Sequence, residues 1–453
     1  MKIIKKARSG VGKAWGKQKI KETEYRLLRY TLTTECEEGQ LLYNVVTGEL
    51  VLLDPKEEIL IKNLPSNYTS EYNELVEKHF LVPVDYDEHK VVGQLRRLLT
   101  AMEGKKTIQG YTILPTTYCN ARCFYCYESD FPHVHMTEET AHDVVEYMAS
   151  HSDGKKVSIQ WFGGEPLLGA KIIRQISNEL AEKGIEYQAS MISNGYLFDE
   201  NMVTEAKEVW KLNMVQITID GTEEVYNKTK AYVSVPGSPY QRVVRNIQLL
   251  SKAGIKVSIR LNLGFHNEED IRMLIPELAD RLSDCENVNM YAHELFDGEG
   301  FTPVNYDDVA RSHLLRTVDK LTRIIEKNGM SPGRKNLPTL STSHCMADKD
   351  SSVMIHPGGE LTKCEHCSAA DKFGSIYSEN IDKDAYNYWK KHMEFPECNE
   401  CAMFPSCYWP EGCPNKKECY PEVRKKLMDN YIKEISLTYG DMKQDKYSKE
   451  RGE

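Results

Sequence analysis

The chain has 453 residues, of which 40% are hydrophobic and 28% are charged. This is the composition of an ordinary globular protein, and the formal net charge of −10 argues against nucleic-acid binding driven by bulk positive charge. No apolar run approaches the roughly 18–20 residues of a membrane helix, and the first residues lack the apolar core of a signal peptide. We therefore expect a cytoplasmic protein of about three domains, with neither nucleic acid nor membrane as a partner.

Residues 1–22 form a basic segment. The first 21 residues contain eight lysines and arginines and no acidic residue. A run of like charge is typical of a solvated, mobile arm, which we expect here. Contact of this arm with an acidic peptide or a phospholipid is the alternative.

Residues 23–104 are predicted to form a small separate domain. Three short β-rich runs come first, and a Thr-Gly pair indicates a turn between the last two. Helical patterns follow over residues 55–62, 71–79 and 86–102. Three strands followed by three helices favour a winged-helix-like module. The three β-rich runs are EYRLLRYTL, QLLYNVV and ELVLL.

Residues 105–330 repeat a strand-then-helix pattern six times. Six such units in order predict an α/β fold with a parallel sheet and outer helices. Because a closed barrel has eight units, we expect a partial (β/α)6 barrel with its chemistry at the carboxyl ends of the strands. The strand runs are YTILPTT, VSIQWF, YQASMIS, VQITID, KVSIRLNL and VNMYAHEL. The helical stretches lie near 137–151, 170–183, 199–209, 240–253, 268–282 and 306–328.

The remainder of the chain divides into three parts. Residues 331–344 are rich in Pro, Ser and Thr and are predicted to be a linker. Residues 345–439 form a cysteine-rich domain whose last helix spans about 421–438. The charged tail, residues 440–453, is expected to be frayed.

The thirteen cysteines are unevenly placed. Three lie within residues 119–126 and eight within 345–419. A secreted disulfide framework is short and evenly stapled, whereas clustered cysteines in a reduced cytosolic chain more often bind metal.

The first cluster, spaced C-x₃-C-x₂-C, directly follows the first barrel strand. It consists of Cys119, Cys123 and Cys126. A structural zinc site is normally closed by four ligands. Three cysteines on one short loop can instead hold three irons of a [4Fe–4S] cube and leave the fourth iron open. The alternatives are a zinc site completed by a distant histidine, or reduced core cysteines.

Polar residues stand at the ends of later strands. The second strand ends in Gly-Gly-Glu-Pro, where two glycines let the backbone approach a ligand closely and Glu165 offers a carboxylate to an ammonium group. The third ends in Ser-Asn-Gly, suited to a ribose or a carboxylate, and the fifth carries Arg260, a carboxylate clamp. Singly, these are ordinary turns and a solvated charge; together with an open iron they describe the binding of S-adenosylmethionine (SAM). The residues are Gly163, Gly164, Glu165, Pro166, Ser193, Asn194 and Arg260.

Over residues 108–330 the chain resembles the radical SAM superfamily. The resemblance rests on C-x₃-C-x-Y-C, with Tyr125 before the last cysteine, and on GGEP. It implies that the three cysteines ligate the cluster and that SAM chelates the fourth iron. It further implies that Glu165 and the GGE backbone hold the amino group of SAM and that Arg260 holds its carboxylate. Ser193 or Asn194 would contact the carboxylate or the ribose, and Tyr125 would lie near the adenine, mainly through its backbone.

The same resemblance implies a reaction. One-electron reduction breaks the S–C5′ bond of SAM, and the 5′-deoxyadenosyl radical abstracts a hydrogen from an unactivated carbon. A flavodoxin- or ferredoxin-type protein is the expected electron donor.

The C-terminal cysteines admit two interpretations. Cys364 and Cys367 with Cys398 and Cys401 have the spacing of a zinc ribbon, which leaves four cysteines unused. The stretch is also similar to the SPASM extension of radical SAM enzymes, which implies two auxiliary [4Fe–4S] clusters. The inner cluster would take Cys345, Cys364 and Cys413, with Cys367 as a possible fourth ligand. The outer cluster would take Cys398, Cys401, Cys407 and Cys419. Cys367 and the five residues between Cys407 and Cys413 depart from the family pattern, and an inner iron left open would be able to bind a substrate thiolate.

Two acidic residues are candidates for catalysis. Glu365 follows Cys364, where the sulfatase-maturing branch of the family has an aspartate acting as a base; a solvated surface glutamate is the alternative. Asp220 ends the fourth strand and faces the same cavity, although an Asp-Gly turn also explains it. Glu294 and Asp297, after the sixth strand, are weaker candidates.

SPASM enzymes that resemble this chain mostly modify peptides. Residues 23–104 are similar in architecture to the RiPP recognition element, which pairs a leader peptide against its edge strand; a structural or dimerising domain is the alternative. We therefore expect a peptide maturase that binds a small precursor by its leader and installs a cross-link. A thioether is the first choice, and a C–C or C–O bond the second. A formylglycine-generating sulfatase maturase and a non-catalytic zinc or Fe–S binding protein are the alternatives.

Overall fold

The computed structural model describes most of the chain. The described residues are 1–102, 107–233, 236–295, 308–333, 336–343, 345–389, 396–407 and 421–451. Within these ranges, no helix combines the length and the apolar character that crossing a membrane requires.

A nine-stranded sheet forms the centre of the molecule, with strand order β13-β12-β11-β10-β9-β8-β14-β15-β16. Its first six strands along the chain run parallel to one another. Each overlaps one of the six predicted strand runs, so the predicted partial barrel is confirmed. These strands are β8 (Gly110–Ile113), β9 (Val157–Trp161), β10 (Tyr187–Ser193), β11 (Leu212–Ile219), β12 (Lys256–Leu263) and β13 (Val288–Glu294).

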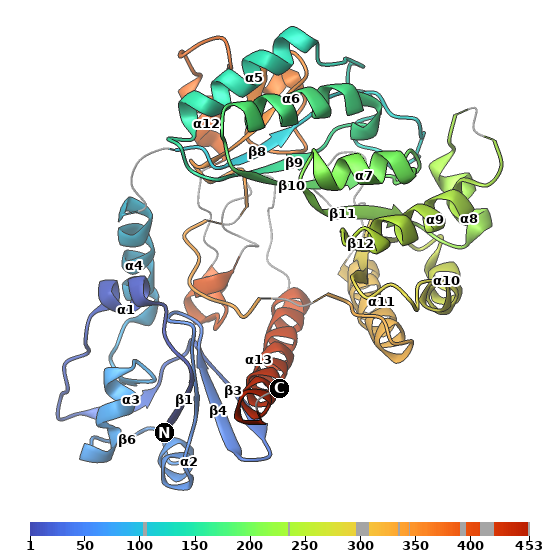
Figure 1. The fold of residues 1–453 in the computed structure, drawn as a ribbon. Helices are drawn as coiled ribbons and strands as arrows, with labels where there is room; N and C mark the ends of the chain where they lie inside the picture. Colours follow the sequence, from blue (N-terminus) through green and yellow to red (C-terminus); the bar gives the residue numbers. More distant parts are fainter. Residues whose placement is uncertain are drawn as a thin grey trace.

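Helices cover the outer side of this curved sheet (Figure 1). The apolar faces of the strands and helices meet in one large core, which includes the fully buried Tyr111, Trp161 and Trp210. The helices are α5 (Glu138–His151), α6 (Ala170–Glu182), α7 (Glu200–Glu208), α8 (Glu223–Lys230), α9 (Pro239–Lys252), α10 (Glu268–Arg281) and α11 (Asp308–Lys327), with a 3-10 turn η2 (Pro166–Gly169). The sequence pattern missed α8, whose eight residues are too few for a clear apolar period.

The C-terminal extension continues the same sheet. β14 pairs parallel with β8, with Ile355 opposite Ile113, and β15 turns back antiparallel to β14. The turn between them needs a left-handed residue, which Gly359 supplies at φ +85°. Sequence analysis did not foresee these strands. They are β14 (Ser352–Ile355), β15 (Glu360–Thr362) and β16 (Gly374–Ser375), followed by α12 (Lys383–Tyr388), with 3-10 turns η3 (Ala369–Asp371), η4 (Pro396–Glu400) and η5 (Phe404–Ser406).

The N-terminal part contains two small antiparallel sheets rather than one. Their strand orders are β1-β5-β4-β3 and β6-β2-β7. The first predicted β-rich run is therefore divided, and its halves belong to different sheets because the chain turns at Leu28–Tyr30. The strands are β1 (Lys2–Lys5), β2 (Glu24–Leu27), β3 (Thr31–Cys36), β4 (Gly39–Asn44), β5 (Glu49–Leu52), β6 (Ser66–Asn67) and β7 (Leu81–Pro83). The helices are α1 (Ser9–Trp15), α2 (Pro55–Lys62), α3 (Asn73–Glu77) and α4 (Glu88–Met102), with η1 (Ser70–Tyr72).

The expectation of a solvated basic arm at residues 1–22 is wrong. β1 pairs antiparallel with β5, with Ile3 opposite Val51. Helix α1 then buries Val11, and the ring of Trp15 stacks on His79 with 4.0 Å between centroids. The many lysines make the sequence pattern of this short β-strand and helix difficult to recognise. In the structure their charged ends reach solvent while the residues between them pack.

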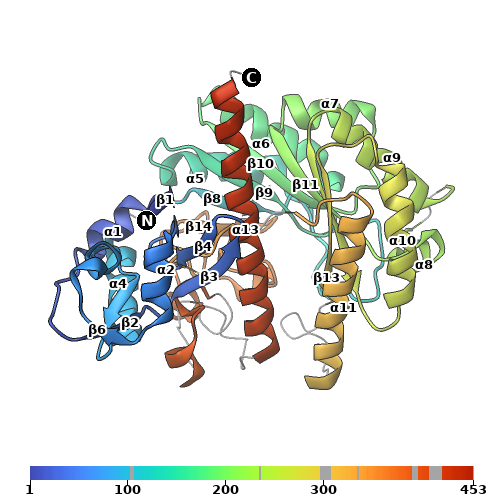
Figure 2. The ribbon, with the colours of Figure 1, turned by 90° about the horizontal axis from the view of Figure 1, so that it is seen from below.

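The last helix also differs from expectation. α13 (Pro421–Arg451) stays helical to residue 451, so the tail is not frayed before that point. It runs along β3, where Tyr431, Ile435 and Tyr439, spaced by four residues, join the core of the N-terminal part. Figure 2 shows α13 beside β3 and β4.

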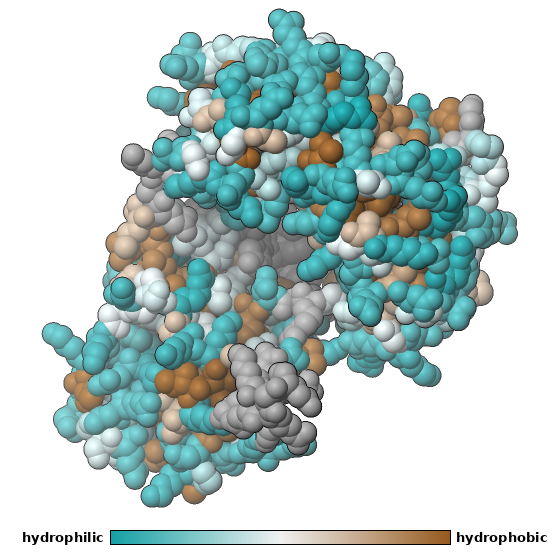
Figure 3. Space-filling model, in the orientation of Figure 1, coloured by the Kyte–Doolittle hydropathy of each residue, from teal (hydrophilic) through white to brown (hydrophobic). Residues whose placement is uncertain are grey.

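Residues 336–343, from the predicted linker, contact the N-terminal part as well. The Tyr43 hydroxyl donates to the Pro338 carbonyl at 2.8 Å, and Arg8 donates to Thr339 at 3.0 Å. On the face seen in Figure 3, hydrophilic side chains dominate over the barrel helices and hydrophobic ones form only small patches.

Candidate active site

The three-cysteine loop, residues 119–126, follows β8 at the carboxyl end of the sheet. Its thiols are all partly buried, and the Ala121 N–H donates to Cys119 Sγ at 3.4 Å. Lys230, the last residue of α8, contacts the loop, since its carbonyl accepts from Arg122 N–H at 2.8 Å. The loop therefore has a fixed shape and presents its sulfurs with N–H donors nearby, as iron–sulfur ligands are commonly held.

Burial makes these thiols difficult to ionise by themselves. It raises the pKa of Cys119 to about 12 and that of Cys126 to about 11, against the opposing effect of backbone N–H donors. Thiolates here need positive charge beside them, which metal ions supply. Among the described residues, no three His, Cys, Asp or Glu side chains converge as a single metal ion would require. A cube does not require such convergence, because each thiolate binds a different iron.

The GGEP turn lies directly against the start of this loop. A Cβ on Gly163 would lie 2.3 Å from the Thr116 carbonyl oxygen, and one on Gly164 would lie 2.4 Å from that of Tyr118. Gly163 also has a φ of +110°. These contacts give both glycines a role besides the predicted contact with a ligand, because only a residue without Cβ fits against the backbone of the loop.

Glu165 is fully buried and joins the ends of β9 and β10. Its Oε1 accepts from the Ser193 hydroxyl at 2.8 Å and from Leu167 N–H at 3.1 Å, and its Oε2 accepts from Asn194 N–H at 2.8 Å. Burial raises the pKa of Glu165 to about 7, although these donors and the charge of Lys230 lower it. The carboxylate therefore fixes the relative positions of two strand ends beside the cysteines.

Asn194 extends this connection to the cysteine loop. Its side-chain amide donates to Asn120 Oδ1 at 2.7 Å and approaches Cys119 Sγ at 4.0 Å. The predicted residues at the ends of β8, β9 and β10 thus form one continuous polar cluster.

A second polar cluster surrounds the hydroxyl of Tyr125. The Tyr125 hydroxyl donates to Asp220 Oδ2 at 2.8 Å and accepts from Lys230 at 2.9 Å and from Asn262 at 3.2 Å. Lys230 and Asp220 form an ion pair at 3.0 Å, and both are almost fully buried. Asp220 is therefore more than an Asp-Gly turn. Sequence analysis missed Lys230 and Asn262, because no spacing or motif distinguishes them from solvated residues.

Some buried polar atoms around the loop have no hydrogen-bond partner within the described residues. They are Asp220 Oδ1, Asn262 Oδ1 and Asn120 Nδ2. A buried acceptor or donor without a partner costs about 1–3 kcal/mol. Unmatched acceptors and a donor beside three thiols fit a polar cofactor with amino, carboxylate and hydroxyl groups, such as SAM.

The C-terminal extension brings Glu365 to the same end of the barrel. The Tyr127 hydroxyl donates to the Glu365 carbonyl at 3.4 Å. Burial raises the pKa of Glu365, whereas the charge of Arg260 and a hydrogen bond from Gln160 lower it. Glu365 is thus not a solvated surface glutamate. The Nη2 atom of Arg260, on β12, also lies 3.2 Å from His293 Nδ1.

Glu128 is a further buried acid that sequence analysis overlooked. It is 9% exposed, and burial together with the nearby Glu365 raises its pKa to about 7. The only signal in the sequence is its place two residues after Cys126.

Two C-terminal cysteines come together in one small buried cluster. Cys364 and Cys367 are buried with Ala347 and Trp389. The Cys367 thiol and burial both raise the pKa of Cys364. Cys345 lies close enough that Cys364 also raises its pKa, after the larger effect of burial. Cys413, the remaining predicted member of this inner set, lies outside the described residues.

Two described cysteines of the predicted outer set lie against the N-terminal part. Cys398 belongs to the core shared by β3, β4, α4 and α13, and Cys401 packs beside it. Arg96 of α4 anchors this stretch by donating to the Phe404 carbonyl at 2.7 Å. Cys407 follows, and Cys419 lies outside the described residues.

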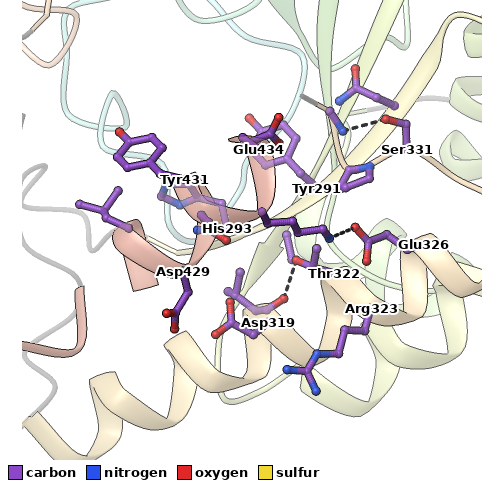
Figure 4. A pocket seen from close by; sticks show the side chains of 18 of the residues that line it. Tyr291, His293, Asp319, Thr322, Arg323, Glu326, Ser331, Asp429, Tyr431 and Glu434 are labelled. Atoms are coloured by element: carbon purple, nitrogen blue, oxygen red, sulfur yellow. Dashed lines mark hydrogen bonds and ion pairs between the residues drawn. The ribbon is translucent and has the colours of Figure 1, made fainter. Parts of the chain in front are cut away.

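A cavity of about 860 Å³ lies between the edge strand β13, helix α11 and helix α13 (Figure 4). The Glu326–Lys433 ion pair, from α11 and α13, lies at its wall. Glu294 and Cys407 also line it. Asp297, the other acidic candidate after β13, lies outside the described residues.

Comparison with known proteins gives one family match. Residues 113–278 match the model described as the radical SAM superfamily. A cysteine-type anaerobic sulfatase-maturating enzyme of Clostridium novyi is 23% identical over 331 residues, which are 66% of this chain and 86% of that protein. The radical SAM cyclopropyl synthase TigE of Paramaledivibacter caminithermalis is 23% identical over 192 residues, 35% of this chain and 39% of TigE.

Solved structures that share the fold include two with a bound peptide. Native anSMEcpe with bound AdoMet and Cp18Cys peptide matches with a TM-score of 0.52 and 16% identity, covering 75% of this chain and 99% of that one. SuiB of Streptococcus suis bound to its precursor peptide SuiA matches with a TM-score of 0.52 and 15% identity, covering 88% of this chain and 98% of that one. At these identities the similarity is one of fold.

Proposed function

Because residues 113–278 match the radical SAM superfamily, we propose that this protein is a radical SAM peptide maturase. It would bind a ribosomally made precursor peptide, remove a hydrogen from a core residue and install a cross-link. A thioether between a cysteine sulfur and a carbon is the first choice, and a C–C or C–O bond the second.

One observation carries this proposal: residues from four separate segments meet beside the three-cysteine loop. Glu165, Ser193 and Asp220 come from three strand ends, and Glu365 comes from the C-terminal extension. Convergence of ionisable groups at the carboxyl end of a parallel sheet is typical of an active site.

The residues present suit SAM bound to a cluster on Cys119, Cys123 and Cys126. SAM so bound supplies a 5′-deoxyadenosyl radical after one-electron reduction. Glu165 would accept the amino group, since each carboxylate oxygen accepts more than one hydrogen bond. Arg260 would hold the carboxylate. Ser193 or Asn194 would contact the carboxylate or the ribose of SAM. The GGEP backbone (Gly163, Gly164, Pro166) would help to hold the amino group, and the backbone of Tyr125 would lie near the adenine.

Two auxiliary [4Fe–4S] clusters would occupy the C-terminal cysteines. The inner cluster would hold the substrate thiolate and accept the second electron when the carbon radical bonds to sulfur. Thioether formation takes two hydrogens from the peptide. One would leave as a hydrogen atom to the deoxyadenosyl group, and the other as one electron to this cluster and one proton. Glu365 is the proposed proton acceptor. The inner ligands would be Cys345, Cys364 and Cys413, with Cys367 as a possible fourth ligand when no substrate thiolate is bound. The outer ligands would be Cys398, Cys401, Cys407 and Cys419.

The N-terminal part would bind the leader of the precursor. β1 and β3 are the outer strands of the four-stranded sheet, and α13 runs along β3. β1 is the more accessible edge, with Ile3 42% exposed. A leader strand would add to β1 by backbone hydrogen bonds. A flavodoxin- or ferredoxin-type protein would donate the electron, and the cytoplasm would supply this reducing setting.

The proposal is tested with anaerobically reconstituted protein, SAM and dithionite. We expect about 12 irons per chain for three clusters, and 5′-deoxyadenosine that disappears when the three loop cysteines are replaced by alanine. Peptides encoded beside this gene would then lose two mass units for each cross-link, which tandem mass spectrometry locates. Colourless protein with one or two zinc ions, or no 5′-deoxyadenosine, contradicts the proposal.

A sulfatase maturase is the second candidate. It is favoured by the match that spans 86% of the Clostridium novyi enzyme. Incubation with the Cp18Cys peptide decides between the two. Formylglycine in that peptide supports the second candidate, whereas its absence together with a cross-link in the precursor supports the first.

A further inference from the structure

Lys230 is a buried cation beneath the three-cysteine loop. It ends helix α8 and is 4% exposed. Its Nζ donates to the Tyr125 hydroxyl at 2.9 Å and pairs with Asp220 at 3.0 Å. It also lies over the rings of Tyr125 and Tyr226, at 5.5 and 5.9 Å from their centroids. Because lysine is rarely buried, and a buried pair adds little to stability, this residue calls for an explanation other than folding.

The Lys230 side chain stays charged in this position. Burial by itself lowers the pKa of Lys230, but attraction to Asp220, Tyr125 and Cys123 outweighs burial and raises it well above its usual value. The same positive charge lies beside the cysteine loop, because Lys230 Nζ donates to the Tyr125 hydroxyl at 2.9 Å and Tyr125 directly precedes Cys126.

The backbone of the same residue holds the loop. The Lys230 carbonyl accepts from Arg122 N–H at 2.8 Å, and the Asn120 carbonyl accepts from Val233 N–H at 2.9 Å. Ala231, between Lys230 and Val233, has a left-handed φ of +44°, which turns the chain from α8 toward the loop. Residues 230–233 therefore contact the three-cysteine loop through both the main chain and the Lys230 side chain.

We propose that Lys230 is a positioning residue that holds Tyr125 under the loop and favours reduction of the SAM-binding cluster. This inference rests on the proposed function in that Cys119, Cys123 and Cys126 carry the cluster. Reduction adds one electron from the donor protein to the cluster and forms or breaks no bond. The added negative charge is stabilised by the nearby ammonium, as electrostatic tuning of iron–sulfur centres requires.

The test compares Lys230→Met, Lys230→Gln and Lys230→Arg in the reconstituted full chain. The readout is the midpoint potential of the SAM-binding cluster, followed by its EPR signal during a redox titration without peptide. We expect both neutral variants to lower the ratio of reduced to oxidised cluster about ten-fold at a fixed potential, a shift of about 59 mV for one electron. Lys230→Arg keeps the charge and is expected to stay near the wild type. Lys228→Met, on the exposed side of the same helix, is the matched control and should change nothing.

Each outcome decides the inference. Unchanged potentials in Lys230→Met and Lys230→Gln overturn it. If the neutral variants fail to hold iron while Lys230→Arg holds it, the site requires the positive charge and the inference stands. If Lys230→Arg loses iron as well, the shape of lysine matters rather than its charge, and the inference is overturned. Because the titration uses no peptide, these results are independent of whether a precursor is modified.

Discussion

At the scale of single residues, the site depends on buried ionisable groups that satisfy one another. Glu165 accepts three hydrogen bonds, and Tyr125 lies between Asp220 and Lys230. Such networks specify one arrangement of strand ends when each member is paired, and the loss of one member leaves the others unsatisfied.

Glu165→Gln tests this network. The substitution replaces an acceptor oxygen by an N–H₂ group that faces existing donors, so we expect the free energy of unfolding to fall by about 1–3 kcal/mol. We also expect slower formation of 5′-deoxyadenosine. Urea unfolding and product analysis measure the two effects. Glu182→Gln, on the exposed side of α6, is the control; a Glu165→Gln protein with unchanged stability and SAM cleavage would refute the assigned role.

His356 gives the protein a pH-dependent stability. Burial lowers its pKa to about 4 in the folded chain, against about 6.5 in the unfolded chain, and its Nε2 lies 3.0 Å from Thr362 Oγ1. The unfolded state therefore binds more protons between these values. This contribution is fully present above pH 6.5 and is lost as the pH falls toward 4, to a total of about 3 kcal/mol.

Urea unfolding at pH 7.5 and pH 5 measures the effect. His356→Gln should reduce the difference between the two pH values, while His151→Gln, at an exposed position, should not. An equal pH dependence in wild type and His356→Gln would show that other groups cause it.

At the scale of elements, close contact between β-strand ends explains the glycines of the GGEP turn. A Cβ at Gly164 would lie 2.4–2.6 Å from backbone atoms of Tyr118 and Thr117. Backbone cannot move aside as a flexible side chain does, so the turn and the cysteine loop must shift together.

Gly164→Ala is thus expected to separate the GGEP turn from the cysteine loop. We predict loss of iron from the SAM-binding site, seen as about four fewer irons per chain, and loss of 5′-deoxyadenosine. Gly93→Ala in α4, where a Cβ meets nothing within 4 Å, is the control and should be neutral or stabilise by up to about 1 kcal/mol. Full iron content in Gly164→Ala would contradict the argument.

At the scale of the whole molecule, the two ends of the chain share one core. Residues from β3, β4, α4, the 398–407 segment and α13 pack together. The N-terminal part is therefore not independent of the cysteine-rich extension, although the two are separated by the entire barrel in sequence.

Ile435→Ala tests this coupling. Ile435 is fully buried in the shared core, so its truncation should cost about 2–5 kcal/mol. We expect faster hydrogen exchange in β3 and β4 as well as in α13, measured by mass spectrometry. Leu437→Ala is the control because Leu437 is 43% exposed. Faster exchange confined to α13 would show that the parts are not coupled.

The sequence alone determined the local features of this protein. The partial barrel followed from six repeats of a strand and helix pattern, since periodicity is a local property. The three-cysteine loop and the GGEP turn were identified because motifs with short spacing are also local. The same approach failed at residues 1–22, where net charge concealed β1 and α1, and at the divided first strand.

Only the tertiary structure decided which distant residues meet. Lys230, Glu128 and Asn262 carry no motif, and their importance comes from burial beside groups far away in the sequence. The pairing of β14 with β8, the packing of α13 on β3 and the approach of Glu365 to Arg260 are non-local as well. Such contacts depend on the packing of whole elements, which the pattern of a single segment does not contain.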